Sequence, residues 1–213
     1  MTFPEVVCVL GIGRNYRDHA AELGNDAPER PMVFAKAPFR VTGEGDPIVL
    51  PACCETEQVD YEGELAVLLG RDAKNVALED ALSYVAGYAA ANDITARWWQ
   101  KHGSGGQFVR GKSFDSFCPI GPWRSAEEVS DPQALRIVTT LNGEVVQDGP
   151  DDTLDGTVYF DKGQTITVRV TASDGTAEGS DPSASVVVRN TAPSAAGVSI
   201  SPDSPTAGED DLR

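Results

Sequence analysis

The sequence lacks the features that would place it in a membrane or on nucleic acid. No apolar stretch approaches the roughly 20 residues that a helix needs to cross a bilayer. The N-terminal residues have no basic flank followed by a long apolar run, so we expect no signal peptide. Lysine and arginine together number 17 against 33 acidic residues, and the formal net charge is −16. Because phosphate binding needs clustered cations, we expect no nucleic acid as a partner. The lack of a long apolar stretch leads us to expect no membrane as a partner.

Cysteine is also scarce, with four residues in 213. None has the spacing typical of a zinc site or of a disulfide framework. Cys53 and Cys54 are adjacent, and a bridge between neighbours would be strained. Reduced thiols in a cytoplasmic protein are therefore the expectation.

Residues 149–213 contain no tryptophan, histidine, cysteine or methionine, unlike the rest of the chain. Short alternating segments separated by glycine, proline, aspartate and serine are typical of a β-sandwich. This region resembles a fragment of a bacterial immunoglobulin-like or cadherin-like repeat. We predict two domains, 1–148 and 149–213, with a break in the second near 191–194. Strands in the second domain are expected at 164–175, 183–190 and 197–205.

Residues 1–148 mix strand and helix signals without regular alternation, which favours an α+β domain built largely on sheet. The stretch YRDHAAELG predicts a helical turn or short helix over 16–24, closed by Gly24. Apolar residues at helical spacing predict a helix over 78–93. The pair Asn142-Gly143 predicts a type I′ hairpin turn within 135–149. Strands bounded by glycine or proline are expected at 6–13, 31–38, 46–51 and 59–70.

Three carboxylates stand at alternate positions in the segment VDYEGELAVLLG: Asp60, Glu62 and Glu64. Alternate residues of a strand share a face, so these side chains are expected to project together. Grouped carboxylate oxygens suit a hard divalent cation. A strand end whose polar face meets solvent shows the same alternation, so spacing alone leaves both interpretations open.

Asp93 and Lys112 are further candidates, each with a simpler explanation. Asp93 stands at the end of the second predicted helix and is either a third metal ligand or a helix cap. Lys112 lies in a predicted loop rich in glycine and aromatic residues. It is either a solvated surface lysine or a group that stabilises an oxyanion.

His19 and Glu22 are three residues apart on the first predicted helix and share one face of it. A carboxylate beside an imidazole orients the ring and raises its basicity, as a general base requires. A surface pair of modest stabilising effect has the same spacing, and this stretch taken alone favours that interpretation.

Taken together and in order, segments over roughly residues 6–148 resemble the fumarylacetoacetate hydrolase family. The resemblance implies metal ligands at Glu62, Glu64 and Asp93, a water-activating pair of His19 and Glu22, an active-site lysine at Lys112, and substrate contacts from Arg97 and Gln100. Asp60 is left outside the ligand set. The segments that carry the resemblance are GRNYRDHAAELG, PMVFAKAP, GEGDPIVLP, VDYEGELAVLLGRDAKNV, AGYAAANDITARWWQ, RGKSFDSFCPIGPW and LNGEVVQD.

The resemblance also implies a fold and a reaction. The fold would be a mixed β-roll, and the protein a homodimer that takes a small keto-acid substrate. Mg²⁺ or Mn²⁺, with Ca²⁺ as a further candidate, would bind an acylpyruvate or related diketo acid. His19 would then take a proton from the water that cleaves the C–C bond, and Lys112 would stabilise the oxyanion. The alternative is an isomerase or decarboxylase acting on 2-hydroxy-diene-dioates.

The sequence departs from the family after Asp148. Family members continue with several strands that complete the β-roll, and residues 149–213 do not resemble them. We therefore expect a truncated catalytic domain with exposed sheet edges, in which the site residues are present but the pocket is incomplete. A non-catalytic structural or adhesion module is the remaining alternative, suggested by the second region.

Overall fold

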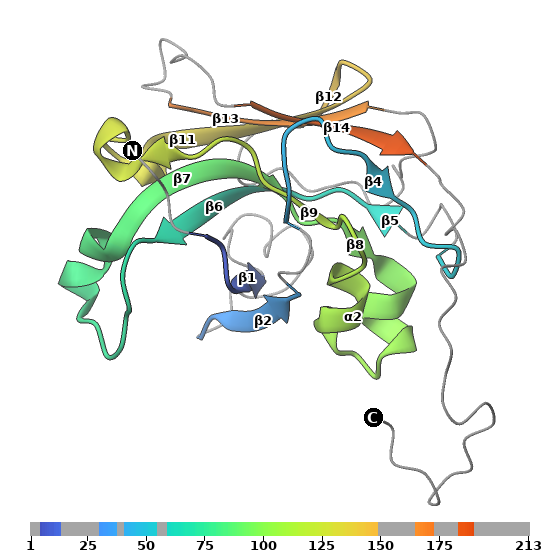
Figure 1. The fold of residues 1–213 in the computed structure, drawn as a ribbon, viewed down its shortest axis with the longest axis horizontal. Helices are drawn as coiled ribbons and strands as arrows, with labels where there is room; N and C mark the ends of the chain where they lie inside the picture. Colours follow the sequence, from blue (N-terminus) through green and yellow to red (C-terminus); the bar gives the residue numbers. More distant parts are fainter. Residues whose placement is uncertain are drawn as a thin grey trace, which may run out of the picture.

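The computed structural model is built mainly from strands, with a few short helices (Figure 1). It describes residues 5–13, 30–37, 41–54, 59–148, 165–172 and 183–189. A five-stranded sheet lies over a three-stranded sheet, and a two-stranded ribbon and helix α2 (Phe108–Lys112) lie on the far side of the latter (Figure 1). The five-stranded sheet mixes parallel and antiparallel pairs, and together with the few helices it confirms the α+β class.

The three-stranded sheet has the order β10-β7-β6 and is antiparallel. Its strands are β6 (Gly63–Leu69), β7 (Val85–Asn92) and β10 (Arg124–Ser125). The helix predicted over 78–93 is wrong, because a 3₁₀ helix η3 (Leu78–Tyr84) leads directly into β7. Alanine favours helix in isolation, but β7 has partners along both edges and most of its residues are buried, so tertiary pairing overrides local propensity.

The five-stranded sheet has the order β12-β11-β13-β14-β4. The predicted hairpin is confirmed: β11 and β12 pair antiparallel, and Asn142 and Gly143 at the turn both have positive φ angles, 52° and 88°. The strands are β4 (Ile48–Val49), β11 (Leu135–Leu141), β12 (Glu144–Asp148), β13 (Thr165–Ala172) and β14 (Ser183–Arg189).

Strand β13 covers one edge of β11, whereas the sequence predicts exposed sheet edges after residue 148. It pairs antiparallel with β11 along the whole strand, from Leu135 opposite Ala172 to Leu141 opposite Ile166. The strands predicted at 164–175 and 183–190 therefore exist but belong to the same sheet as the β11–β12 hairpin. An immunoglobulin-like or cadherin-like fragment is not confirmed, and the boundary at residue 148 stays a prediction. The strand expected at 197–205 and the break near 191–194 lie outside the described residues.

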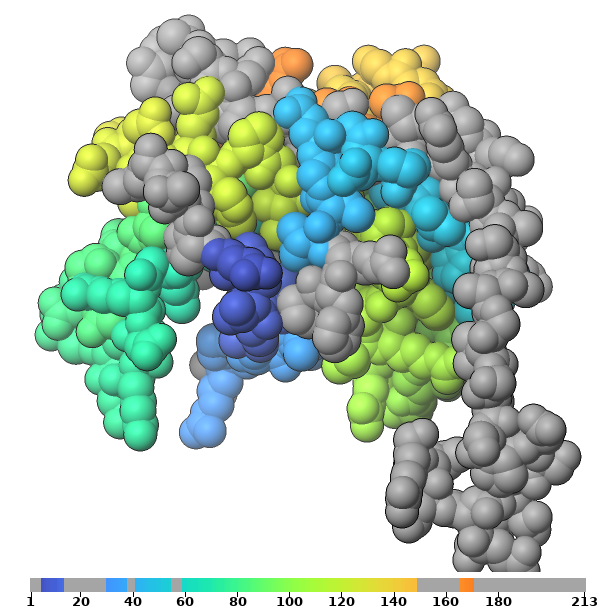
Figure 2. All heavy atoms as spheres, in the orientation of Figure 1, coloured from blue at the N-terminus to red at the C-terminus, as the bar shows by residue number. Residues whose placement is uncertain are grey.

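Three two-stranded pairs complete the described structure. β1 pairs antiparallel with β2, β3 pairs parallel with β9, and β5 pairs antiparallel with β8. The β1–β2 ribbon lies between the segment that follows β6 and the segment that carries α2 (Figure 2). The bounds are β1 (Val9–Gly13), β2 (Met32–Lys36), β3 (Val41–Thr42), β5 (Val59–Asp60), β8 (Thr95–Ala96) and β9 (Cys118–Pro119), with a π-helix η4 (Trp99–Gly103) and 3₁₀ helices η5 (Ala126–Glu128) and η6 (Pro132–Ala134).

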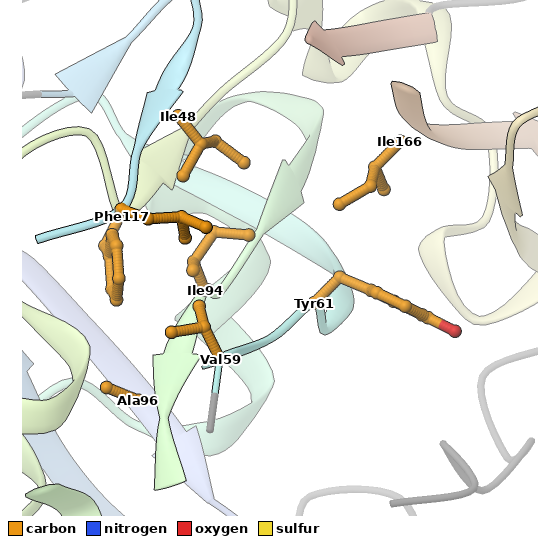
Figure 3. Packing of buried hydrophobic residues seen from close by; sticks show 8 residues of the cluster. Ile48, Val59, Tyr61, Ile94, Ala96, Phe117 and Ile166 are labelled. Carbon is orange, nitrogen blue, oxygen red and sulfur yellow. The ribbon is translucent and has the colours of Figure 1, made fainter. Parts of the chain in front are cut away.

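The largest hydrophobic cluster fixes the short strands β5 and β8. Val59 of β5 and Ala96 of β8 are fully buried in it, and Ile166 reaches it from β13 (Figure 3). The five-stranded sheet therefore helps to hold the two strands that flank the predicted site. None of the helices in the described ranges combines the length and hydropathy of a transmembrane span.

Candidate active site

Two of the predicted ligands, Glu62 and Asp93, meet at a break between two antiparallel strand pairs. The pair β5–β8 lies on one side of the break and the pair β6–β7 on the other. Tyr61 and Glu62 separate β5 from β6, and Asp93 and Ile94 separate β7 from β8. The Asp93 amide donates to the Glu62 carbonyl at 2.8 Å, and the Glu62 amide donates to the Asn92 side chain at 2.9 Å. The two main chains thus stay tied together at the interruption that Glu62 and Asp93 share.

Lys112 joins these two carboxylates. Its Nζ lies 3.2 Å from Glu62 Oε2, 2.5 Å from Asp93 Oδ2 and 2.8 Å from Thr95 Oγ1, and the residue is only 3% exposed. Lys112 is the last residue of α2, so the prediction of a loop is wrong, and its burial excludes the alternative of a solvated surface lysine.

Glycine lets α2 approach closely enough for this contact. A Cβ at Gly111 would lie 2.6 Å from the Gln100 amide nitrogen and 2.9 Å from the Ala96 carbonyl oxygen. Any side chain there would push α2 away from η4 and β8, because both of those atoms belong to the backbone. The glycine before Lys112 therefore sets the depth at which the ammonium group enters the site.

Arg97 links three side chains of the site. Its Nε donates to Asp60, one terminal nitrogen lies 2.7 Å from Glu62 Oε1, and the other donates to Gln100 Oε1 at 3.1 Å. Gln100 is buried within η4. Arg97 therefore organises the carboxylates, and the prediction that Arg97 and Gln100 contact substrate stays a prediction.

Sequence reasoning missed Lys36 and Thr95. Lys36, the last residue of β2, is 3% exposed, and its Nζ donates to Asp93 Oδ1 and to the Ile94 carbonyl. Thr95 Oγ1 lies 3.1 Å from Glu62 Oε1. The sequence does contain one signal. Lys36 is the last residue of the apolar strand MVFAK and occupies the face of that strand that is more buried. A lysine in that place is rare unless it is paired.

The charges of the cluster determine its protonation. Burial raises the pKa of Glu62, but Lys112 and Arg97 outweigh burial and hold that pKa at about 2. Burial lowers the pKa of Lys112, but Glu62 and Asp93 outweigh it, and the pKa is raised overall. Burial also raises the pKa of Asp60, against the opposing effect of Arg97. At neutral pH, Glu62 is therefore ionised and Lys112 carries its proton.

The donor set fits a divalent ion in its chemistry, because Glu62, Glu64 and Asp93 all offer carboxylate oxygens. Glu62 and Asp93 also converge on one positive atom, the Nζ of Lys112. Within the described ranges, no three histidine, cysteine, aspartate or glutamate side chains are grouped as an ion would need them. Glu64, half-buried on β6, is the predicted third ligand, and the ligand assignment stays a prediction.

His19 and Glu22 lie outside the described residues. Their role as the water-activating pair therefore stays a prediction. The described part of the site contains carboxylates together with two buried ammonium groups and one guanidinium group. Cationic donors of this kind, not the carboxylates, are the groups that stabilise negative charge on an oxygen.

Comparison with known protein families shows to which family the chain belongs. The family model "Fumarylacetoacetate (FAA) hydrolase C-terminal" matches residues 8–171. The chain belongs to the fumarylacetoacetate hydrolase family. The matched range contains every described residue of the site and extends into β13.

Two curated relatives in this family are named as tautomerases. Oxaloacetate tautomerase YisK of Bacillus subtilis is 48% identical over 144 residues, which cover 66% of this chain and 47% of that protein. The mitochondrial oxaloacetate tautomerase FAHD2A of Homo sapiens is 42% identical over 146 residues, which cover 68% of this chain and 45% of that protein. The chain spans about half the length of the curated relatives it matches.

A solved structure extends the likeness to the fold. The fumarylpyruvate hydrolase of Pseudomonas aeruginosa, in complex with Mn²⁺ and pyruvate, superimposes with a TM-score of 0.73 and 27% identity. The match covers 90% of this chain and 92% of that structure. A family member of similar fold therefore holds a divalent ion together with a keto acid.

Proposed function

We propose that this chain carries the active site of a metal-dependent enzyme that promotes enol formation in an α-keto acid, and that it interconverts the keto and enol forms of a substrate like oxaloacetate. The observation that carries the proposal is the buried cluster in which the carboxylates of Glu62 and Asp93 converge on the protonated Lys112. Relatives at 42–48% identity that are named oxaloacetate tautomerases support this choice.

The side chains of the cluster would bind the reactants and stabilise charge. Glu62, Glu64 and Asp93 are the residues proposed to hold a Mg²⁺ or Mn²⁺ ion. When bound, such an ion supplies Lewis-acid polarisation of the keto-acid oxygens. Lys112 would donate a hydrogen bond from Nζ to the oxygen on which negative charge develops. Its burial strengthens this interaction, because the local dielectric constant is lower than that of water.

Enol formation also requires a base that takes a proton from carbon and then delivers it to the enolate oxygen, with the reverse transfer in ketonisation. Lys112 does not suit this role, because its raised pKa keeps the ammonium protonated. Glu62 does not suit it either, since a carboxylate with a pKa of about 2 is a weak base. We propose His19, oriented by Glu22, as the base. A single base is enough for tautomerisation, whereas hydrolysis also needs an activated water molecule.

Hydrolysis of a C–C bond in an acylpyruvate is the second candidate. The observation that favours it is the likeness in fold to the fumarylpyruvate hydrolase. Isomerisation or decarboxylation of 2-hydroxy-diene-dioates shares the same enolate and forms a third possibility within the family. A small keto acid as substrate, a homodimeric state and a cytoplasmic location are part of this proposal.

The purified chain can be tested with both classes of substrate in the presence of Mn²⁺. Conversion of the enol of oxaloacetate, followed by ultraviolet absorbance, is expected to be faster than the rate without protein and to be abolished by chelation of the ion. Cleavage of an acylpyruvate would be followed in parallel. Faster cleavage than tautomerisation would replace the first candidate by the second. The absence of both reactions, with Mn²⁺ bound, would refute the proposal.

A further inference from the structure

A buried polar network reaches the site from the five-stranded sheet. Gln147 of β12 donates through its side-chain nitrogen to the Gly63 carbonyl at 3.2 Å, and Thr139 of β11 donates to Gln147 Oε1 at 2.6 Å. Thr139 is 0% exposed and Gln147 is 5% exposed. Gly63 stands between Glu62 and Glu64, two of the three proposed metal ligands.

The close approach at Gly63 leaves no room for a side chain. A Cβ there would lie 2.2 Å from Thr139 Oγ1 and 2.5 Å from Gln147 Oε1. The absence of a side chain is therefore what allows the two polar groups to reach the main chain of β6. Contact of this kind fixes the position of the peptide group that leads into Glu64.

The pairing of β11 with β12 directs Gln147 inward. Thr139 stands opposite Gln147, whereas Thr140 stands opposite Val145, so one extra residue is inserted on β12 between these pairs. Such a bulge changes the direction of the side chains on its strand, and bulges are frequent next to active sites. A regular register would pair Thr139 with Val146 and would place a different side chain over Gly63.

We propose that Gln147 and Thr139 are positioning residues that hold the main chain at Gly63 and thereby set the spacing of the Glu62 and Glu64 carboxylates for a divalent ion. This inference rests on the proposed function, since it concerns the metal site of that function. Groups that orient metal ligands without touching the ion commonly change metal affinity by 10–100-fold when they are removed. The network would act in this way through the backbone.

The test measures Mn²⁺ binding to the full chain by electron paramagnetic resonance of the free ion. Gln147→Met removes the donor to Gly63 at nearly constant volume, and we expect the dissociation constant to rise roughly 10-fold. Thr139→Val removes only the hydroxyl group, and we expect a smaller rise in the same direction. Thr139→Ser keeps the hydroxyl group and should restore the affinity of the unsubstituted chain.

Thr140→Val is the matched control, because it makes the same change one residue along β11 and outside the network. Its dissociation constant should equal that of the unsubstituted chain. The melting temperature without Mn²⁺ is measured for every variant, and binding is measured well below it. If Gln147→Met does not fold, the test uses the Mn²⁺ dissociation constant of Thr139→Val. This constant is compared with those of Thr139→Ser and Thr140→Val.

Two results would overturn the inference in distinguishable ways. If the unsubstituted chain binds Mn²⁺ and the variants bind it equally well, the network only fills a buried sheet contact, and the proposed function stands. A lowered melting temperature with unchanged affinity leads to the same conclusion. If the unsubstituted chain does not bind Mn²⁺, the proposed function fails, and the inference fails with it.

Discussion

Two buried regions of this molecule lie side by side and differ in what holds them together. The hydrophobic cluster around Ile166 and Val59 consists of apolar side chains, which gain free energy when they leave water. The cluster around Lys112 consists of charged groups, whose burial is costly unless every charge is paired. Hydrophobic residues of similar volume would often stabilise a fold at least as well as buried ion pairs. The charged cluster is therefore better explained by chemistry than by stability.

The largest expected effect comes from unpairing the charged cluster. Lys112→Met leaves Glu62 and Asp93 facing each other without their shared cation, and we expect it to destabilise the fold by roughly 3–5 kcal/mol. Urea denaturation measures this free energy. Loss of the donor to the developing oxyanion should also lower kcat by about 10²–10³-fold.

The matched control for Lys112→Met is Arg136→Met, which breaks an ion pair with Asp148 at 2.6 Å on the surface. Because solvent screens exposed pairs, we expect a loss of at most about 1 kcal/mol. Equal losses in the two variants would contradict the contrast between buried and exposed charges.

The next effect tests whether β13 belongs to the core of the catalytic fold. Ile166→Ala removes a fully buried side chain, and we expect a loss of about 2–5 kcal/mol in the free energy of unfolding. Thr167→Ala, on the opposite face of the same strand, should cost less than about 1 kcal/mol. If both variants unfold at the same denaturant concentration as the unsubstituted chain, β13 does not contribute to this core.

A further test is the response of stability to acid. The pKa of Glu62 is lowered from 4.5 to about 2, so its pairing stabilises the fold fully above pH 4.5, and this contribution is lost as the pH falls through about 2. Glu62→Gln cannot titrate, and we expect its free energy of unfolding to fall less over that interval. Denaturation at a series of pH values measures the difference. If the free energy of unfolding changes with pH by the same slope in both proteins, Glu62 is not held ionised by Lys112 and Arg97.

Local sequence signals predicted the strands and the hairpin turn well. The pair Asn142-Gly143 adopts the positive φ angles that its chemistry favours, and the strands at 31–38 and 135–149 form where expected. The segment 85–92 could not be predicted in the same way. Its alanines are compatible with a helix, and only the partners on both edges make it a strand.

The sequence did not reveal which distant segments contact one another. The alternation in 164–175 predicts a strand but does not say that β11 is its neighbour. Lys36 was likewise overlooked, because a single lysine in an apolar strand becomes informative only once Asp93 is seen beside it. The carboxylates were easier to find, since Glu62 and Glu64 lie two residues apart in one segment.

The ion pair between Lys36 and Asp93 joins residues 57 positions apart in the chain, and Lys112 reaches Glu62 across 50 positions. Contacts of such high sequence separation form late, since the chain must first lose the entropy of closing a long loop. A partly folded chain would thus hold Asp93 without Lys36 and Glu62 without Lys112. The cluster accordingly favours slow, all-or-none acquisition of the native state, and refolding should accelerate when a small cation is available to neutralise the acids early.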